Sequence, residues 1–141
     1  MEVDRQGMIV LDAAACAALL GTTRLGRIAL TQQALPVILP VAFGLLDDGL
    51  VFNTGPGLLQ RAAQEEQVAC FEADWADEDF NDAWSVWAIG RLSALSHPGD
   101  VRRAQELDLS LWPAVDGEFV RLAPQIFSGR RRAGVPPRRQ T

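Results

Sequence analysis

One strand-to-helix junction carries the residues with the clearest potential for chemistry. The segment Phe52-Asn53-Thr54-Gly55-Pro56-Gly57-Leu58-Leu59 places an amide, a hydroxyl and two glycines directly before a predicted helix. Glycines let a backbone approach an anion closely, and the free N–H groups that open a helix point toward such an anion. Arg61 lies one turn into the same helix. The junction is therefore a candidate anion site, and the alternative is an ordinary turn that Gly and Pro make geometrically.

A second candidate is the segment Trp84-Ser85-Val86-Trp87. Side chains at i and i+3 of a strand face opposite sides, so we expect one tryptophan in the core and the other against a planar ligand or a partner. The more common use of such residues is core packing or a dimer contact.

Side chains for acid–base, nucleophilic or metal chemistry are scarce. The one histidine, His97, stands in a Ser-His-Pro loop, and the two cysteines, Cys16 and Cys70, lack metal-ligand spacing. We expect a solvated histidine, reduced and buried cysteines, and no metal site. All 13 basic residues are arginine and tyrosine is absent, which excludes Schiff-base lysine, P-loop lysine and catalytic tyrosine. An enzyme built from this chain would depend on an external cofactor.

The charge distribution argues against nucleic acid as a partner. The net charge is −5, and eight of the 18 acidic residues lie between residues 65 and 82. The acidic residues at 74–82 are so closely spaced that they indicate a solvated loop rather than a catalytic pair with shifted pKa values. The last 13 residues hold five arginines, so we expect residues 129–141 to form a basic, flexible tail after a domain over residues 1–128.

Length and hydropathy indicate one domain in the cytoplasm. A chain of 141 residues can bury the core of a single domain. The apolar stretch at 13–20 is too short to cross a membrane, and the N-terminal residues carry no signal-peptide pattern. We therefore expect no membrane association.

A mainly β structure has to position these candidate sites. Alternating apolar residues and turn signals predict six strands, mostly joined by hairpins, and three short helices. The strands are expected at 25–30, 36–45, 50–54, 67–75, 83–96 and 118–127, and the helices at 13–20, 58–66 and 98–107. Asp12 and Gly21 should cap the first helix, with Gly21 in a left-handed conformation. Pro36 and Pro40 cannot donate to a ladder, so their strand should lie at an edge or carry a bulge. Without a repeated βαβ unit, the pattern favours a small antiparallel barrel.

Several segments, taken in order, carry a family resemblance. They are Leu25-Gly26-Arg27-Ile28-Ala29, Pro36-Val37-Ile38-Leu39-Pro40-Val41-Ala42-Phe43, Thr54-Gly55-Pro56-Gly57, Trp84-Ser85-Val86 and Gly129-Arg130-Arg131. Their order and spacing over residues 9–131 resemble the pyridoxamine 5′-phosphate oxidase-like, FMN-binding split-barrel family. Within it, the small branch near nitroimidazole-resistance-type proteins is the most similar.

The resemblance implies a six-stranded antiparallel split β-barrel with short flanking helices. It also implies a homodimer that holds FMN, or a related flavin, in two equivalent grooves between the subunits. The residues matched to cofactor binding, together with two arginines that could replace missing cations, are Arg27, Pro40, Val41, Phe52, Asn53, Thr54, Gly57, Leu58, Leu59, Arg61, Trp84 and Ser85. No catalytic side chain is assigned.

The phosphate site departs from the family pattern. Asn53 stands where arginine is usual, Leu58 where a hydroxyl is usual, and Leu59 where lysine is usual. Charge-assisted hydrogen bonds contribute about 1.5–3 kcal/mol each. Losing two would therefore lower phosphate affinity by about two to four orders of magnitude.

Two functions follow. The first is an FMN-dependent oxidoreductase that acts on a small molecule, with a nicotinamide or similar electron donor. The alternative is a non-catalytic split-barrel dimer that binds a deazaflavin, another planar ligand or nothing. Oxidation of pyridoxamine 5′-phosphate itself is disfavoured, because no substrate-phosphate site built from several cations is visible.

Overall fold

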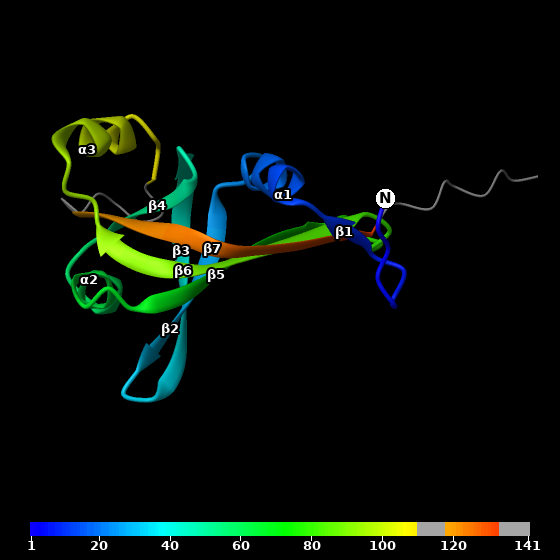
Figure 1. The fold of residues 1–141 in the computed structure, drawn as a ribbon, viewed down its shortest axis with the longest axis horizontal. Coiled ribbons are helices and arrows are strands. Elements are labelled where there is room, and N and C mark those ends of the chain that lie inside the picture. The colour runs from blue at the N-terminus through cyan, green and yellow to red at the C-terminus, as the bar shows by residue number, and fades with distance from the viewer. Residues whose placement is uncertain (110–117, 133–141) are drawn as a thin grey trace, which may run out of the picture.

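Seven antiparallel strands and three short helices make up the computed structural model, which describes residues 1–109 and 118–132 (Figure 1). The strands are β1 (Ile9–Leu11), β2 (Leu25–Gln32), β3 (Leu35–Leu46), β4 (Gly49–Thr54), β5 (Val68–Ala76), β6 (Ala83–Ala94) and β7 (Glu118–Arg132). The helices are α1 (Ala13–Leu20), α2 (Leu58–Gln64) and α3 (Pro98–Gln105). The predicted mainly β class is confirmed, and β1 is the strand that the sequence did not predict.

Strands β2 to β7 close into a barrel. Hydrogen-bonded neighbours follow the order β7-β4-β3-β2-β5-β6, and β6 pairs again with β7. This is the six-stranded barrel that the alternating pattern predicted. β1 lies outside the ring and pairs with residues 129–131 of β7.

The barrel is split where β3 changes partner. β3 pairs with β4 only over residues 43–46 and with β2 over residues 35–42. β4 continues beside β7 as far as Thr54, so β3 and β4 part beyond the Phe43–Phe52 pair. We call residues 35–42 of β3 the open edge, because among the described residues only β2 pairs with them.

The two prolines lie on the open edge, which confirms the prediction. The amide of Phe43 donates to the carbonyl of Arg24 at 3.0 Å. Hydrogen-bonded and non-hydrogen-bonded pairs alternate along an antiparallel ladder. The pair Arg27–Pro40 therefore falls on a non-hydrogen-bonded position, where the proline nitrogen faces away from β2 and loses no hydrogen bond.

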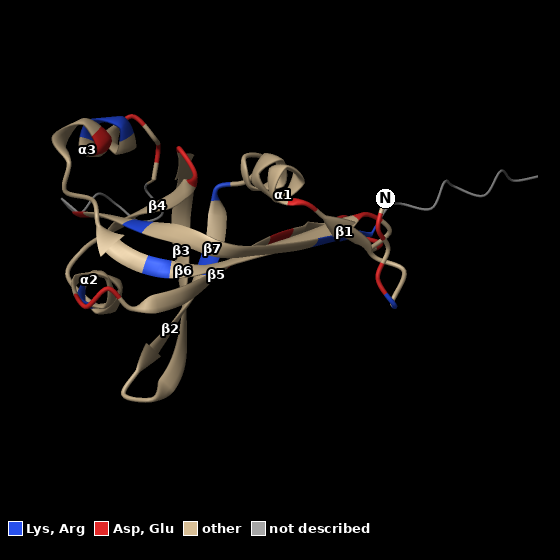
Figure 2. Ribbon diagram, in the orientation of Figure 1, with Lys and Arg blue, Asp and Glu red and all other residues tan. Residues whose placement is uncertain are grey.

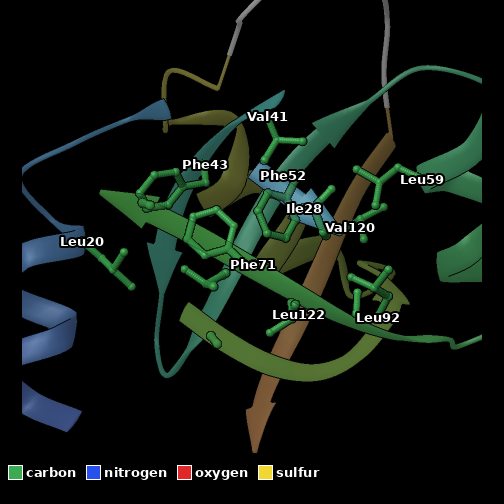
Figure 3. Close-up of a cluster of buried hydrophobic side chains, with 14 of the residues drawn as sticks. Leu20, Ile28, Val41, Phe43, Phe52, Leu59, Phe71, Leu92, Val120 and Leu122 are labelled. Atoms are coloured by element: carbon green, nitrogen blue, oxygen red, sulfur yellow. The ribbon is translucent and has the colours of Figure 1, made fainter. Parts of the chain in front are cut away.

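Three phenylalanines meet at the centre of the barrel. The ring centroids of Phe43 and Phe71 are 4.7 Å apart, and those of Phe52 and Phe71 are 5.6 Å apart. Figure 3 shows these rings among aliphatic side chains from several strands, with Leu20 of α1 and Leu59 of α2 beside them. Burying each side chain of this size contributes about 1.5–3 kcal/mol, so this cluster contributes substantially to the stability of the fold.

The helix ends agree with the sequence in part. The carboxylate of Asp12 accepts from the amide of Ala15 at 2.8 Å and caps α1 as predicted. The left-handed conformation predicted for Gly21 is wrong, because its φ is −65°. His97 is exposed, as predicted, and its Nδ1 accepts from the amide of Gly99 at the start of α3. No helix in the described part of the chain is long and apolar enough to cross a membrane.

The last strand runs further than predicted. β7 continues past residue 127 to Arg132, so residues 129–132 belong to the sheet and not to a tail. Arg130 pairs with Asp4 and Arg131 pairs with Asp82, each at 3.2 Å. These charges gather at the β1 end of the sheet (Figure 2). Residues 133–141 of the predicted tail lie outside the described residues.

Candidate functional site

The junction between β4 and α2 exposes backbone rather than side chains. Gly57 has φ 153° and ψ −153°, a conformation that glycine alone adopts without strain. A Cβ built on Gly57 would meet no atom within 4 Å. No side chain caps α2, so the amides of residues 58–60 have neither a helical nor a side-chain partner. The hydroxyl of Thr54 donates to the carbonyl of Gly55 at 3.0 Å.

One polar atom at this junction is left without a partner. The Oδ1 atom of Asn53 is buried and accepts no hydrogen bond. Among the described residues it is the one buried side-chain nitrogen or oxygen in this state. An unpaired buried acceptor costs about 1–3 kcal/mol, so Oδ1 is a candidate acceptor for a donor that the described residues do not supply. Asn53 lies where β4 and β3 part.

Replacing Asn53 with leucine is expected to stabilise the ligand-free chain by about 1 kcal/mol, because leucine removes the unpaired acceptor at similar volume. Urea denaturation would show a higher midpoint at an unchanged slope. Asn81→Leu is the matched control and should give no gain, because Asn81 lies in a loop and its side chain has no unpaired buried atom. A lower midpoint for Asn53→Leu would mean that Oδ1 is satisfied in the native protein.

Four predicted site residues have their side chains in the core instead. The exposed fraction is 0% for Phe52, 7% for Val41, 4% for Leu59 and 6% for Trp84. Leu59 points into the barrel beside the phenylalanines (Figure 3), so a lysine at this position would enter the core rather than reach a phosphate. That these residues contact a ligand stays a prediction, and the backbone of Val41 lies on the open edge.

Arg61 and Leu58 remain near the junction. Arg61 is exposed in the last turn of α2 and forms no ion pair with any described residue. Leu58 is half-buried against the core. The junction thus has one nearby cation and an apolar residue where the family pattern places a hydroxyl.

Arg27, Pro40 and Ser85 lie on the outer face of the sheet. Arg27 is paired across strands with Pro40 of β3 and with Glu72 of β5, and Ser85 of β6 is opposite Asp74. Arg27 is already engaged, because its guanidinium lies 3.2 Å from Glu72 and 3.8 Å from Asp74. It is therefore poorly placed to replace a missing phosphate cation.

The carboxylates of Glu72 and Asp74 form a pair that the sequence analysis did not predict. The pKa of Glu72 is raised to about 7, chiefly by partial burial and also by the neighbouring Asp74, while Arg27 opposes the shift. Residues two apart on a strand share a face, but β5 joins β2 only through a long-range pairing. No local signal could therefore place Arg27 between the two acids.

The Glu72 shift predicts a pH-dependent stability. Between about pH 4.5 and about pH 7 the folded chain keeps a proton on Glu72 that the unfolded chain has lost, so stability should fall as pH rises through this window. Thermal melts across the window should show a smaller fall for Glu72→Gln than for the wild type. Glu66→Gln, outside the cluster, should follow the wild type. Parallel curves for all three proteins would contradict the assignment.

The two tryptophans face opposite sides of β6, as predicted. Trp84 is buried and Trp87 is 36% exposed on the opposite side of β6. The more exposed aromatic rings are Trp75 and Phe80, which the sequence analysis did not single out. Cys16 is buried and Cys70 half-buried, and both are free thiols.

Comparison with known proteins decides the family. Residues 12–131 match the family model described as pyridoxamine 5′-phosphate oxidase. The chain belongs to this family. An uncharacterized protein of Mycobacterium tuberculosis is 30% identical over an alignment of 131 positions that covers 88% of this chain and 85% of that protein. The resemblance predicted from the sequence is confirmed.

Solved structures of other proteins share the fold. The FAD binding protein from Mycobacterium smegmatis is 28% identical with a TM-score of 0.73, over 88% of this chain and 97% of that one. A Bacteroides thetaiotaomicron protein assigned to 5-nitroimidazole antibiotic resistance has a TM-score of 0.68 at 15% identity, over 88% and 87% of the two chains. The latter likeness shows the fold alone.

Proposed function

We propose that this protein binds a flavin where β3 and β4 part, and that it is a flavin-dependent oxidoreductase acting on a small molecule. The observation that carries the proposal is the buried, unpaired Oδ1 atom of Asn53 beside the open edge. A flavin offers hydroxyl and N–H donors on its ribityl chain and ring. The similarity to the Mycobacterium smegmatis FAD binding protein supports the same ligand class.

The junction fits the ring and ribityl chain of a flavin better than a phosphomonoester. The open edge offers Pro40 and exposed backbone to a flat ring, and Asn53 and Thr54 offer an amide and a hydroxyl. Positive charge is limited to Arg61, because Arg27 is paired with acids. The site therefore holds the phosphate through backbone amides at the start of α2, with little help from side chains.

This charge deficit favours FAD over FMN as the ligand. The phosphomonoester of FMN carries nearly two negative charges on one group at neutral pH. In FAD the two charges lie on separate phosphoryl groups, and the adenosine adds contact area. A site with one nearby cation, Arg61, therefore loses less affinity for FAD than for FMN.

When bound, the flavin would supply hydride or electron transfer. The chain's own residues would do the binding and orienting: Asn53 would accept from the ligand, and the open edge would hold the ring. No general acid or base is assigned to the site, because His97 is an exposed cap residue of α3.

We further infer that the protein is a homodimer. Residues 28–46 contain no charged residue, and Figure 2 shows the projecting β2–β3 hairpin without charge. Leu35 and Ile38 on this hairpin are 66% and 67% exposed. A large, uncharged apolar surface of this kind indicates burial against a partner, here a second copy.

The free thiols Cys16 and Cys70 fit a reducing, cytoplasmic location.

A second candidate function is a non-catalytic carrier of a deazaflavin or another planar ligand. It is favoured by the apolar residues Leu58 and Leu59 at the positions where the family pattern has a hydroxyl and a lysine. Such a protein would keep the split barrel and the ring site, and would not transfer electrons from a nicotinamide.

Anaerobic reduction separates the two functions. The full chain is loaded with FAD or FMN, and NADH or NADPH is added while the flavin absorption band is followed. The oxidoreductase predicts bleaching of the bound flavin faster than that of free flavin, with FAD bound more tightly than FMN. Bound flavin that bleaches no faster than free flavin would favour the carrier. Sedimentation equilibrium of the same samples tests the dimer.

A further inference from the structure

The tip of the β5–β6 hairpin carries two aromatic rings that the fold leaves in water. We use the name hairpin tip for Trp75 and residues 77–82. Trp75 is 49% exposed and Phe80 is 64% exposed, and both line the same hollow. Large rings are costly to leave in water, so the pair indicates a surface that another segment covers.

The loop that carries Phe80 is held in place. The carboxylate of Asp77 accepts from the amides of Asn81 at 2.7 Å and Asp82 at 3.2 Å. Asp82 also pairs with Arg131 of β7. Phe80 has a φ of 54°, which is unusual for a bulky side chain. The turn thus keeps the ring exposed in a conformation that it would not adopt by itself, so the surface is already formed.

Two carboxylates on the hairpin tip have no cation beside them. Glu78 and Asp79 are exposed, and neither forms an ion pair with an arginine in the described part of the chain. Asp77 and Asp82 add two more acids to the same loop, and Arg131 pairs with only one of them. The hairpin tip therefore has an excess of negative charge next to its apolar rings.

The last residues of the chain have the complementary chemistry. They read Ala133-Gly134-Val135-Pro136-Pro137-Arg138-Arg139-Gln140-Thr141, with two arginines and no acid. Proline-rich segments dock on aromatic surfaces at a low cost in conformational entropy. A segment with two prolines followed by two arginines thus matches two rings beside two free carboxylates.

The end of β7 delivers this segment to the hairpin tip. Arg132 pairs with Ala83, the residue that follows the loop at 77–82. β6 separates β7 from β5, so Trp75 lies about 10 Å from β7 at the usual strand spacing. The six residues from Arg132 to Arg138 can span about 20 Å. A tether this short gives an effective concentration in the millimolar range, so weak contacts are enough for docking.

We propose that residues 135–139 dock on the hairpin tip of their own chain. Pro136 and Pro137 cover the two rings, and the two arginines form charge-assisted hydrogen bonds with the free carboxylates of the loop. The hollow continues to Trp84 and Ser85, so the docked segment lies beside two of the predicted flavin contacts. The docking itself uses only the chain's own residues and needs no flavin.

Amide ¹⁵N relaxation of the full chain, recorded without flavin at low ionic strength, tests the proposal. The order parameters of the amides at positions 138 and 139 should exceed about 0.6 in the wild type. Arg138→Glu combined with Arg139→Glu should lower them below about 0.6. The same change should shift the indole signal of Trp75 and leave that of Trp87 in place. Low order parameters in the wild type, or no change in the variant, would overturn the proposal.

A charge exchange tests whether the acids of the loop hold the segment. Adding Glu78→Arg and Asp79→Arg to the doubly reversed segment should restore the order parameters. Glu65→Arg with Glu106→Arg reverses two exposed acids elsewhere, and adding this pair instead should restore nothing. Equal recovery with both pairs would contradict a specific contact with the loop.

Phe80→Asn tests the contribution of the rings. Asparagine tolerates a positive φ, so the turn is kept while the ring is lost. The order parameters at 138 and 139 should fall, and unchanged values would contradict docking on the rings.

A mixed sample tests whether the segment docks on its own chain. The ¹⁵N-labelled protein with Arg138→Glu and Arg139→Glu is mixed with an excess of unlabelled wild type. The Trp75 indole signal should stay at its position in the variant. A return to the wild-type position would mean that the segment docks on a second copy, and would overturn the proposal.

Discussion

Replacing Gly90 with alanine is expected to destabilise the folded chain by about 3 kcal/mol or more. A Cβ at this position would lie 2.7 Å from the carbonyl carbon of Ala123 and closer still to its oxygen. These are backbone atoms of β7, where the register with β6 shifts between Ile89 and Gly90. β6 and β7 close the barrel, so the two strands would have to separate. Urea or thermal unfolding followed by circular dichroism measures the loss.

Gly21→Ala is the matched control for Gly90→Ala. Gly21 has a right-handed conformation with φ −65°, and a Cβ there would meet its nearest atom at 3.4 Å. This variant should be as stable as the wild type or slightly more stable, because alanine reduces the freedom of the unfolded chain. A Gly90→Ala protein with wild-type stability would contradict the close approach of β6 and β7.

The second large effect is expected at Gly57, where alanine should weaken flavin binding at least tenfold. The native φ and ψ of Gly57 are restricted to glycine, and holding another residue there costs about 1–3 kcal/mol. Relieving that strain moves the first amides of α2, which the proposed site uses to hold the phosphate. The new methyl group would also occupy open space at the junction. Equilibrium titration with FAD measures the change, and about 1.4 kcal/mol corresponds to tenfold.

Gly7→Ala controls for backbone strain alone. Gly7 also has a positive φ of 81° and open space around it, but lies in the N-terminal segment before β1. Its alanine variant should lose some stability and keep the wild-type affinity for FAD. The same loss of affinity in both variants would mean that Gly57 acts through general stability and not through the site.

Much of the fold could be predicted because local patterns and long-range pairing agree. The turn signals between the strands, the alternation along β5 and β6, and the two prolines of β3 each placed an element correctly. β1 was missed because three residues give no reliable alternation and its partner is the far end of the chain. For the same reason, the arginines at 130 and 131 looked like part of a tail, although their strand is paired on both sides.

The site could be located from the sequence more easily than its contacts. The glycine-rich segment before α2 marked the junction, and the comparison with the family marked Asn53. The direction of each side chain depends on tertiary packing, so the sequence did not show that the side chain of Leu59 lies in the core. The family pattern has a lysine at position 59. In this chain the position is occupied by Leu59, which belongs to the core.

The most direct test of the account is an equilibrium titration of the full chain with FAD, carried out on the wild type and on Asn53→Leu. The central claim is that the unpaired Oδ1 atom of Asn53 accepts a hydrogen bond from a bound flavin. We predict that the wild type binds one FAD per chain with a shifted visible spectrum, and that Asn53→Leu binds at least tenfold more weakly although its ligand-free form is no less stable. No FAD binding by the wild type, or equal binding by both proteins, would contradict the claim.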